Sequence, residues 1–92
     1  MEQVDAQLDY VIKRIKEIRH EKSISQLELS VKSNMSPSFL ASVEKGKKQP
    51  SVRTLLRIAN ALEVNPRVFF PELVKKPKNE IKETIINLVR SL

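Results

Sequence analysis

The 92-residue sequence has no cysteine, a single glycine and only four aromatic residues. Without cysteine there can be no disulfide, no thiolate metal site and no cysteine nucleophile. Scarce glycine and aromatic residues argue against a β-sandwich and favour helices. No apolar run approaches the roughly 20 residues that a membrane-spanning helix requires. We therefore expect an all-α protein without a membrane span.

One stretch of the chain lacks acidic residues. The chain has 17 basic and 11 acidic residues, a net charge of +6. Between residues 45 and 61 there is no acid, and the five basic residues are Lys45, Lys47, Lys48, Arg53 and Arg57. A basic surface alone fits many soluble proteins. Charge concentrated in one stretch favours a polyanionic partner, nucleic acid first.

Enzyme motifs are also absent. The sequence has no glycine-rich phosphate loop, no cluster of metal ligands and no triad built on its single histidine, His20. The serines stand at expected caps and turns, where local hydrogen bonds account for them. We expect no enzyme activity, no metal, no cofactor and no small-molecule ligand.

The first expected helix runs from about Val4 to Glu21. Its apolar residues recur at steps of three and four, as an amphipathic helix requires, and are Val4, Leu8, Val11, Ile12, Ile15 and Ile18. Tyr10 lies off this stripe, so we expect its ring edge to be exposed. The next expected helix begins at Ser25, which with Glu28 forms a capping box.

We expect Leu27, Leu29 and Val31 to supply the apolar contacts of this second helix, with the small Ser30 at a helix crossing. Asn34 tolerates a left-handed backbone and can reverse the chain. Ser36 and Pro37 then start a third helix as N-cap and first helical residue.

In this third helix Leu40 and Val43 face inward, whereas Ser38, Ala41 and Ser42 are short and lie on other sides. Gly46 ends the helix. A helix with short outward side chains can approach another molecule closely.

Two further helices are expected before the tail. Ser51 caps a helix to about Leu62, and Asn65 with Pro66 starts a short fifth helix that Pro71 limits. Residues 74–79 read as a linker. A last helix from Glu80 to about Ser91 has one apolar stripe, which is not stable alone in water and must pack on its own domain or on a second copy.

These features together resemble the Cro/lambda-repressor-type helix-turn-helix proteins, often called the Xre family, from about Ile12 to Phe70. The residues that support the resemblance are Arg19, Ser25, Gln26, Leu29, Ser30, Asn34, Ser36, Leu40, Val43, Glu44, Gly46, Lys47, Pro50, Ser51, Ile58, Ala59 and Leu62. Two mild departures are Asn34, where the family usually has Gly, and Ser30, where it usually has Ala. The first helix is also longer at its start than is usual. This extra length could pack on the tail or on a partner.

The resemblance implies an all-α, five-helix lambda-repressor-like domain over residues 1–73, with its helix-turn-helix at about 25–45, followed by a linker and C-terminal amphipathic helix over 74–92. It implies that the helix from Ser36 to Glu44 enters the major groove of DNA. The expected base contacts are Ser36, Pro37, Ser38 and Ser42.

The resemblance also assigns supporting roles. The expected contacts to the DNA backbone are Gln26, Phe39, Lys45, Gly46, Lys47 and Lys48, although Phe39 is equally compatible with a core position. Arg19 is expected to pair with Glu44 rather than with phosphate. The expected dimer contacts are Val68 and Phe69, in the region that resembles the family's usual interface, and, from the apolar stripe of the tail, Ile81, Ile85, Leu88 and Leu92.

We therefore expect a cytoplasmic regulator of transcription that binds double-stranded DNA as a homodimer, most simply a repressor of an inverted-repeat operator. Two alternatives stay open at this point. One is a DNA-binding antitoxin or a restriction-modification controller, which would share the same domain. The other is a protein-interaction module in which the helix-turn-helix has been reused. The sequence does not identify the operator, the direction of regulation or the dimer surface.

Overall fold

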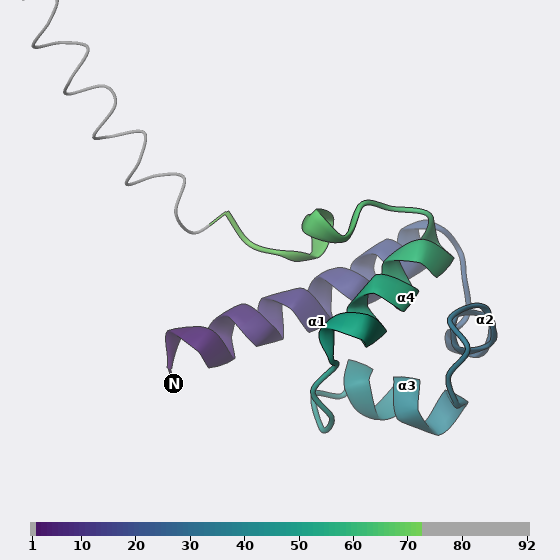
Figure 1. Ribbon diagram of the computed structural model, residues 1–92, viewed down its shortest axis with the longest axis horizontal. Helices are drawn as coiled ribbons and strands as arrows, with labels where there is room; N and C mark the ends of the chain where they lie inside the picture. The colour runs from purple at the N-terminus through teal and green to yellow at the C-terminus, as the bar shows by residue number, and fades with distance from the viewer. Residues whose placement is uncertain (1, 73–92) are drawn as a thin grey trace, which may run out of the picture.

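The computed structural model describes residues 2–72, which form four α-helices and one 3-10 helix and contain no strand (Figure 1). The elements are α1 (Gln3–Glu21), α2 (Gln26–Lys32), α3 (Pro37–Glu44), α4 (Val52–Leu62) and η1 (Pro66–Phe69). The expected linker at 74–79 and the expected last helix lie outside the described residues. The all-α class predicted from the sequence is confirmed.

The helix starts follow the predicted caps. Ser25 Oγ accepts the Glu28 N–H at 3.0 Å, and the Glu28 carboxylate accepts the Ser25 N–H, so the capping box is present. Ser36 and Ser51 cap α3 and α4 in the same way. Asn65 caps η1 by accepting the Arg67 N–H at 3.0 Å. Each side-chain oxygen satisfies an N–H that the first turn of a helix leaves without an intrahelical acceptor.

The two predicted turn residues have left-handed backbones. Asn34 has a φ of 55° between α2 and α3, and Gly46 has a φ of 77° after α3. Asparagine and glycine adopt this region at little cost. Glu63 also takes a left-handed conformation, with a φ of 59°, at the end of α4. Nothing in its residue type predicts this.

In Figure 1, α1 is the long axis of the domain and α4 lies along it. The α2 and α3 pair packs at the C-terminal end of α1, and η1 returns the chain to α1. The N-terminal turns of α1 project beyond the other helices. The domain core therefore lies under the second half of α1.

The core is formed by apolar side chains from all five elements. Its members are Val11, Ile15, Ile18, Leu29, Leu40, Leu55, Ile58, Ala59, Leu62 and Phe69. Most of them lie on the inward stripes predicted for α1, α3 and α4. Burial of this apolar surface, about 25 cal/mol for each Å², is the main force that holds short helices of 7 and 8 residues in place.

Two of the apolar contacts predicted for α2 are wrong. Leu27 and Val31 are 61% and 71% exposed, and Val4, on the apolar stripe of α1, is 66% exposed. In α2 only the face with Leu29 and Ser30 is turned toward the domain. Val4 continues the stripe of α1 beyond the end of the core, so the other helices do not reach it.

The short fifth helix is a single 3-10 turn that ends at Phe69. Phe70 has an extended backbone, with φ −99° and ψ 142°. The residue before a proline is driven to this region by contact with the proline ring, and Pro71 follows directly. No helix between residues 2 and 72 combines the length and the apolar character needed to cross a membrane.

Two leucines on α2 provide a matched test of the packing. Leu29→Ala is expected to lower the free energy of unfolding by about 2–5 kcal/mol, because Leu29 is fully buried. Leu27→Ala is expected to change it by no more than about 0.5 kcal/mol. Urea denaturation followed by circular dichroism measures both. Equal losses in the two variants would contradict this packing of α2.

Candidate nucleic-acid interface

The N-terminal end of α3 is an exposed surface with short side chains. Ser36, Pro37 and Ser38 are all exposed. Ser36 Oγ accepts the Phe39 N–H at 3.1 Å and lies 3.4 Å from Ser38 Oγ. The hydroxyls are therefore held close to the helix backbone. Another molecule can approach this end of the helix with little obstruction from side chains.

The other two residues expected on this surface are less accessible. Ser42, one turn further along α3, and Phe39 are half-buried. The structure thus brings Ser36, Pro37 and Ser38 together at one exposed end and sets Ser42 at its margin. The half-buried ring of Phe39 agrees with both roles left open for it.

The loop after α3 presents exposed cationic side chains. Lys45, Lys47 and Lys48 are exposed. Their backbone N–H groups donate to carbonyls of α3, with Lys47 and Lys48 both bonding the Ser42 carbonyl at 2.9 and 3.2 Å. The Gly46 N–H donates to Val43 at 3.0 Å.

The Gly46 N–H is therefore already bonded within the fold, and the contact of Gly46 with the DNA backbone stays a prediction. No atom lies within 4 Å of the place a Gly46 Cβ would take, so lack of space does not explain the glycine. Its left-handed φ does. The exposed cationic groups of this loop are the side chains of Lys45, Lys47 and Lys48.

A buried ion pair connects α1 to the end of α3. Arg19 Nε donates to Glu44 Oε2 and Arg19 Nη2 donates to Glu44 Oε1, each at 2.9 Å. Arg19 is 8% exposed and Glu44 5%. Such a bidentate arrangement sets the orientation of both side chains as well as their distance. The pair expected from the sequence is thus present in the structure.

The third guanidinium nitrogen of Arg19 is also occupied, and Nη2 has a second neighbour. Nη1 donates to the Ile24 carbonyl at 2.9 Å, in the loop between α1 and α2. Nη2 lies 3.3 Å from His20 Nε2. Because a guanidinium only donates, that histidine nitrogen is the acceptor. Arg19 therefore joins α1, the following loop and α3 through one side chain.

Gln26, at the start of α2, joins the same cluster. Its Nε2 donates to Glu44 Oε1 at 3.2 Å. An amide nitrogen has two hydrogens, so one remains for another acceptor. Gln26 is half-buried, and its amide is oriented by a contact that sequence reasoning missed. No residue pattern predicts this contact, because the two residues are 18 positions apart.

The predicted dimer contact at Phe69 is wrong. Phe69 is fully buried in the core of its own chain. Val68 is half-buried, and its carbonyl accepts Arg14 Nε at 3.4 Å, which holds η1 against α1. The other four predicted contacts, Ile81, Ile85, Leu88 and Leu92, lie outside the described residues.

A different apolar surface occurs on α4. Leu56 is 51% exposed and borders a shallow hollow of about 400 Å³ together with Val64 and Pro66. Sequence reasoning concentrated on the inward stripe of α4 and passed over Leu56. A large apolar residue off that stripe was the available signal.

Among the described residues, no three His, Asp or Glu side chains are grouped as metal ligands would be.

Comparison with known proteins places this geometry in context. The helix-turn-helix family matches residues 15–69. The immunity repressor of Bacillus phage phi105 is 38% identical over 69 residues, which is 73% of this chain and 48% of the repressor. The HTH-type transcriptional regulator y4dJ of Sinorhizobium fredii is 40% identical over 48 residues, or 52% of this chain and 62% of that protein. The chain thus spans only about half to three-fifths of these relatives.

Solved structures of restriction-modification controller proteins are also similar. C.AhdI from Aeromonas hydrophila has a TM-score of 0.67 and 34% identity, covering 71% of this chain and 98% of that one. The C.Esp1396I tetramer in complex with its natural 35 base-pair operator has a TM-score of 0.66 and 35% identity, covering 75% of this chain and 91% of that one.

The ion pair is open to a direct test. Glu44→Ala is expected to lower the free energy of unfolding by about 3–5 kcal/mol, because it leaves the buried Arg19 charge without its partner. Arg19→Met/Glu44→Leu, which removes both charges, is expected to recover most of that loss.

Glu17→Ala is the control, since Glu17 is 51% exposed and pairs with Arg14 at 3.5 Å. It should cost no more than about 1 kcal/mol. Chemical denaturation measures all three variants. If Glu44→Ala were as mild as Glu17→Ala, the pair would not support the position of α3.

Proposed function

Since this chain belongs to the Cro/lambda-repressor-like helix-turn-helix family, we propose that it is a sequence-specific DNA-binding regulator of transcription, acting as a dimeric repressor in the cytoplasm. The observation that supports this most directly is the exposed, short-sided end of α3, held by a buried ion pair and followed by three exposed lysines. The function is binding and has no catalytic step.

In the proposed complex α3 enters the major groove and α2 braces it. Serine hydroxyls both donate and accept, so Ser36 and Ser38 discriminate bases weakly by themselves. Pro37 offers apolar contact to a thymine methyl. We therefore propose that DNA shape and deformability supply part of the sequence preference.

Phosphate contacts position the domain on the duplex. We assign them to the side chains of Lys45, Lys47 and Lys48 and to Gln26, whose second amide hydrogen remains available while Glu44 holds the first. We propose that the half-buried ring of Phe39 lies along the sugar-phosphate backbone. Each neutralised phosphate adds about 0.9 to the log–log salt slope of the binding constant.

Affinity from one such domain is low, which favours a dimer that places two copies of α3 roughly 34 Å apart on an inverted repeat. For the dimer surface we propose the hollow that Leu56 of α4 borders together with Val64 and Pro66, and which Arg53, Arg57 and Asn60 also line. Phe69 is unavailable, and a single exposed apolar patch can pair with itself about a two-fold axis.

A restriction-modification controller is the more specific candidate. It is favoured by the near-complete coverage of C.AhdI at 34% identity. Genes for an endonuclease and a methyltransferase beside this one would support that role. The same position beside a toxin gene would support an antitoxin instead.

Two substitutions separate base reading from phosphate binding. Ser38→Ala is expected to change the order of preference among operator variants, because Ser38 lies at the base-reading end. Lys47→Ala is expected to weaken binding to all DNA sequences alike and to lower the slope of the log–log salt dependence by about 1. Fluorescence anisotropy over a salt series, after selection from random genomic fragments, measures both. Equal effects of both variants on every sequence would contradict the assignment, as would no preference among fragments at low salt.

The proposed dimer surface predicts that charged substitutions at two exposed apolar residues have different effects on dimerisation. Leu56→Asp is expected to convert the dimer to a monomer, because it buries a charge at the centre of the contact. Val31→Asp, at a residue that is 71% exposed on α2, is the control and should leave the dimer intact. Sedimentation equilibrium measures the mass of each. A Leu56→Asp protein that stays dimeric would exclude this surface.

A further inference from the structure

The N-terminal half of α1 has an apolar surface that no other described element covers. Val4 is 66% exposed and Tyr10 43% exposed. Gln3, Ala6, Gln7, Tyr10 and Pro71 line an apolar depression of about 190 Å³ there. Core packing on this helix begins at Val11. The first two turns of α1 thus extend beyond the core, and one of their faces forms this apolar depression.

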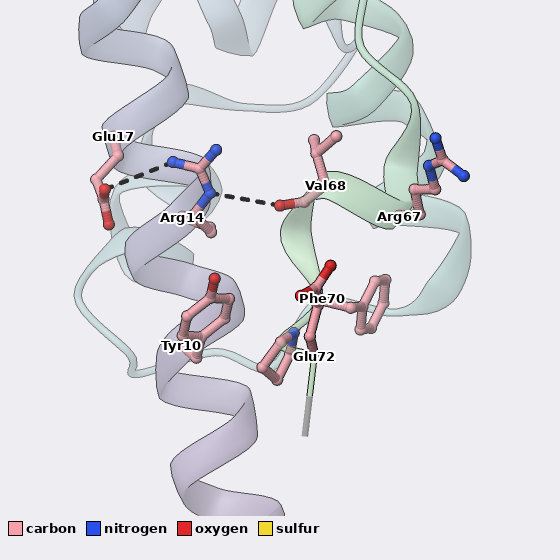
Figure 2. A pocket seen from close by; sticks show the side chains of 8 residues that line it. Tyr10, Arg14, Glu17, Arg67, Val68, Phe70 and Glu72 are labelled. Atoms are coloured by element: carbon pink, nitrogen blue, oxygen red, sulfur yellow. Dashed lines mark hydrogen bonds and ion pairs between the residues drawn. The ribbon is translucent and has the colours of Figure 1, made fainter. Parts of the chain in front are cut away.

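A larger open hollow of about 930 Å³ continues from this depression, with Tyr10 and Pro71 lining both. Figure 2 shows Tyr10 and Arg14 on α1, across from the segment that contains Val68 and Glu72. Arg14 bonds the Val68 carbonyl and Glu17, which closes the hollow toward the core. Together the two form one groove along α1, which we call the α1 groove.

The turns of α1 that carry the outer end of the α1 groove also carry acidic side chains, which do not line the groove itself. Residues 2–12 contain three acidic residues, Glu2, Asp5 and Asp9, and no basic one. All three acids are exposed. An occupant of this surface should therefore be apolar along one stripe and basic beside it.

The last 20 residues of the chain combine a basic stretch with an apolar stripe. Residues 73–78 contain three basic residues and no acidic one, whereas residues 79–92 contain two basic and two acidic residues and have no net charge. Their apolar residues recur at helical spacing at Ile81, Ile85, Leu88 and Leu92. The described chain ends at Glu72, which itself lines the α1 groove.

We propose that the C-terminal segment, residues 79–92, binds in the α1 groove of its own chain, with its apolar stripe against Tyr10 and Ala6. Residues 73–78 span at most about 20 Å when extended, whereas the groove from Tyr10 to Gln3 is about 10 Å long. The segment therefore reaches the whole groove from Glu72.

The same chain is favoured over a second copy by local concentration. A short linker holds its segment at an effective concentration in the millimolar range, which a second copy does not match in dilute solution. If residues 79–92 bind their own chain, their apolar stripe is not available for the dimer contacts that the sequence suggested. This assignment does not depend on DNA binding.

The chain contains its own probe for this contact. Tyr10 is the only tyrosine and there is no tryptophan, so tyrosine emission reports on the α1 groove alone. Acrylamide quenching is measured on the full chain without DNA. Ile85→Asp/Leu88→Asp removes the stripe, and Asn87→Asp/Ser91→Asp adds the same charge away from it.

The wild-type protein and the Asn87/Ser91 variant are expected to quench alike. The Ile85/Leu88 variant is expected to show a quenching constant about twofold larger, because the ring then regains the exposure it has without a cover. Circular dichroism checks that all three proteins keep their helices. Protection of the Tyr10 ring from acrylamide should not change between about 1 and 100 µM protein. Both concentrations lie far below the effective concentration of the tethered segment.

Equal quenching in all three proteins would overturn the proposal, as would a larger constant in the Asn87/Ser91 variant. Protection that disappears on dilution would also overturn it, because the occupant would then be a second copy.

Discussion

The bidentate ion pair between Arg19 and Glu44 is the constraint on which the position of α3 depends. Two short helices cannot hold their angle by apolar packing at Leu29 and Leu40 alone, because such contacts have no direction. The ion pair adds direction, and it is buried, so separation of the two groups would leave each charge without its countercharge. Through Ile24 and Gln26 the same two residues also hold the start of α2.

In this arrangement the residues that hold α3 in position are different from the residues proposed to contact DNA. The charged groups that set geometry lie inside, where water does not screen them, and the groups proposed to meet DNA lie outside on the same helix. The outer groups at Ser36, Pro37 and Ser38 are small. A short side chain fixes few hydrogen bonds, so selectivity in the proposed complex depends on how closely and at what angle α3 approaches. The inner ion pair controls that angle.

The long first helix serves two parts of the molecule. From Val11 onward it belongs to the core, and Arg14 and Arg19 connect it to η1 and α3. Before Val11 it extends past the domain as an acidic and apolar surface. The helix-turn-helix match begins at residue 15, so the outer turns lie before the matched part of the chain. A contact made there would leave α3 free for its own partner.

Local chemistry in the sequence was sufficient for the helix starts, the turns at Asn34 and Gly46, the inward stripes and the helix-turn-helix itself, because capping, left-handed backbones and periodicity act between residues a few positions apart. Burial was different. That Phe69 is inside while Phe70 is half exposed, or that Leu27 faces outward, follows from how elements distant in sequence pack together. The contact between Gln26 and Glu44 likewise exists only because α2 and α3 fold onto the end of α1, which brings their side chains within hydrogen-bonding distance.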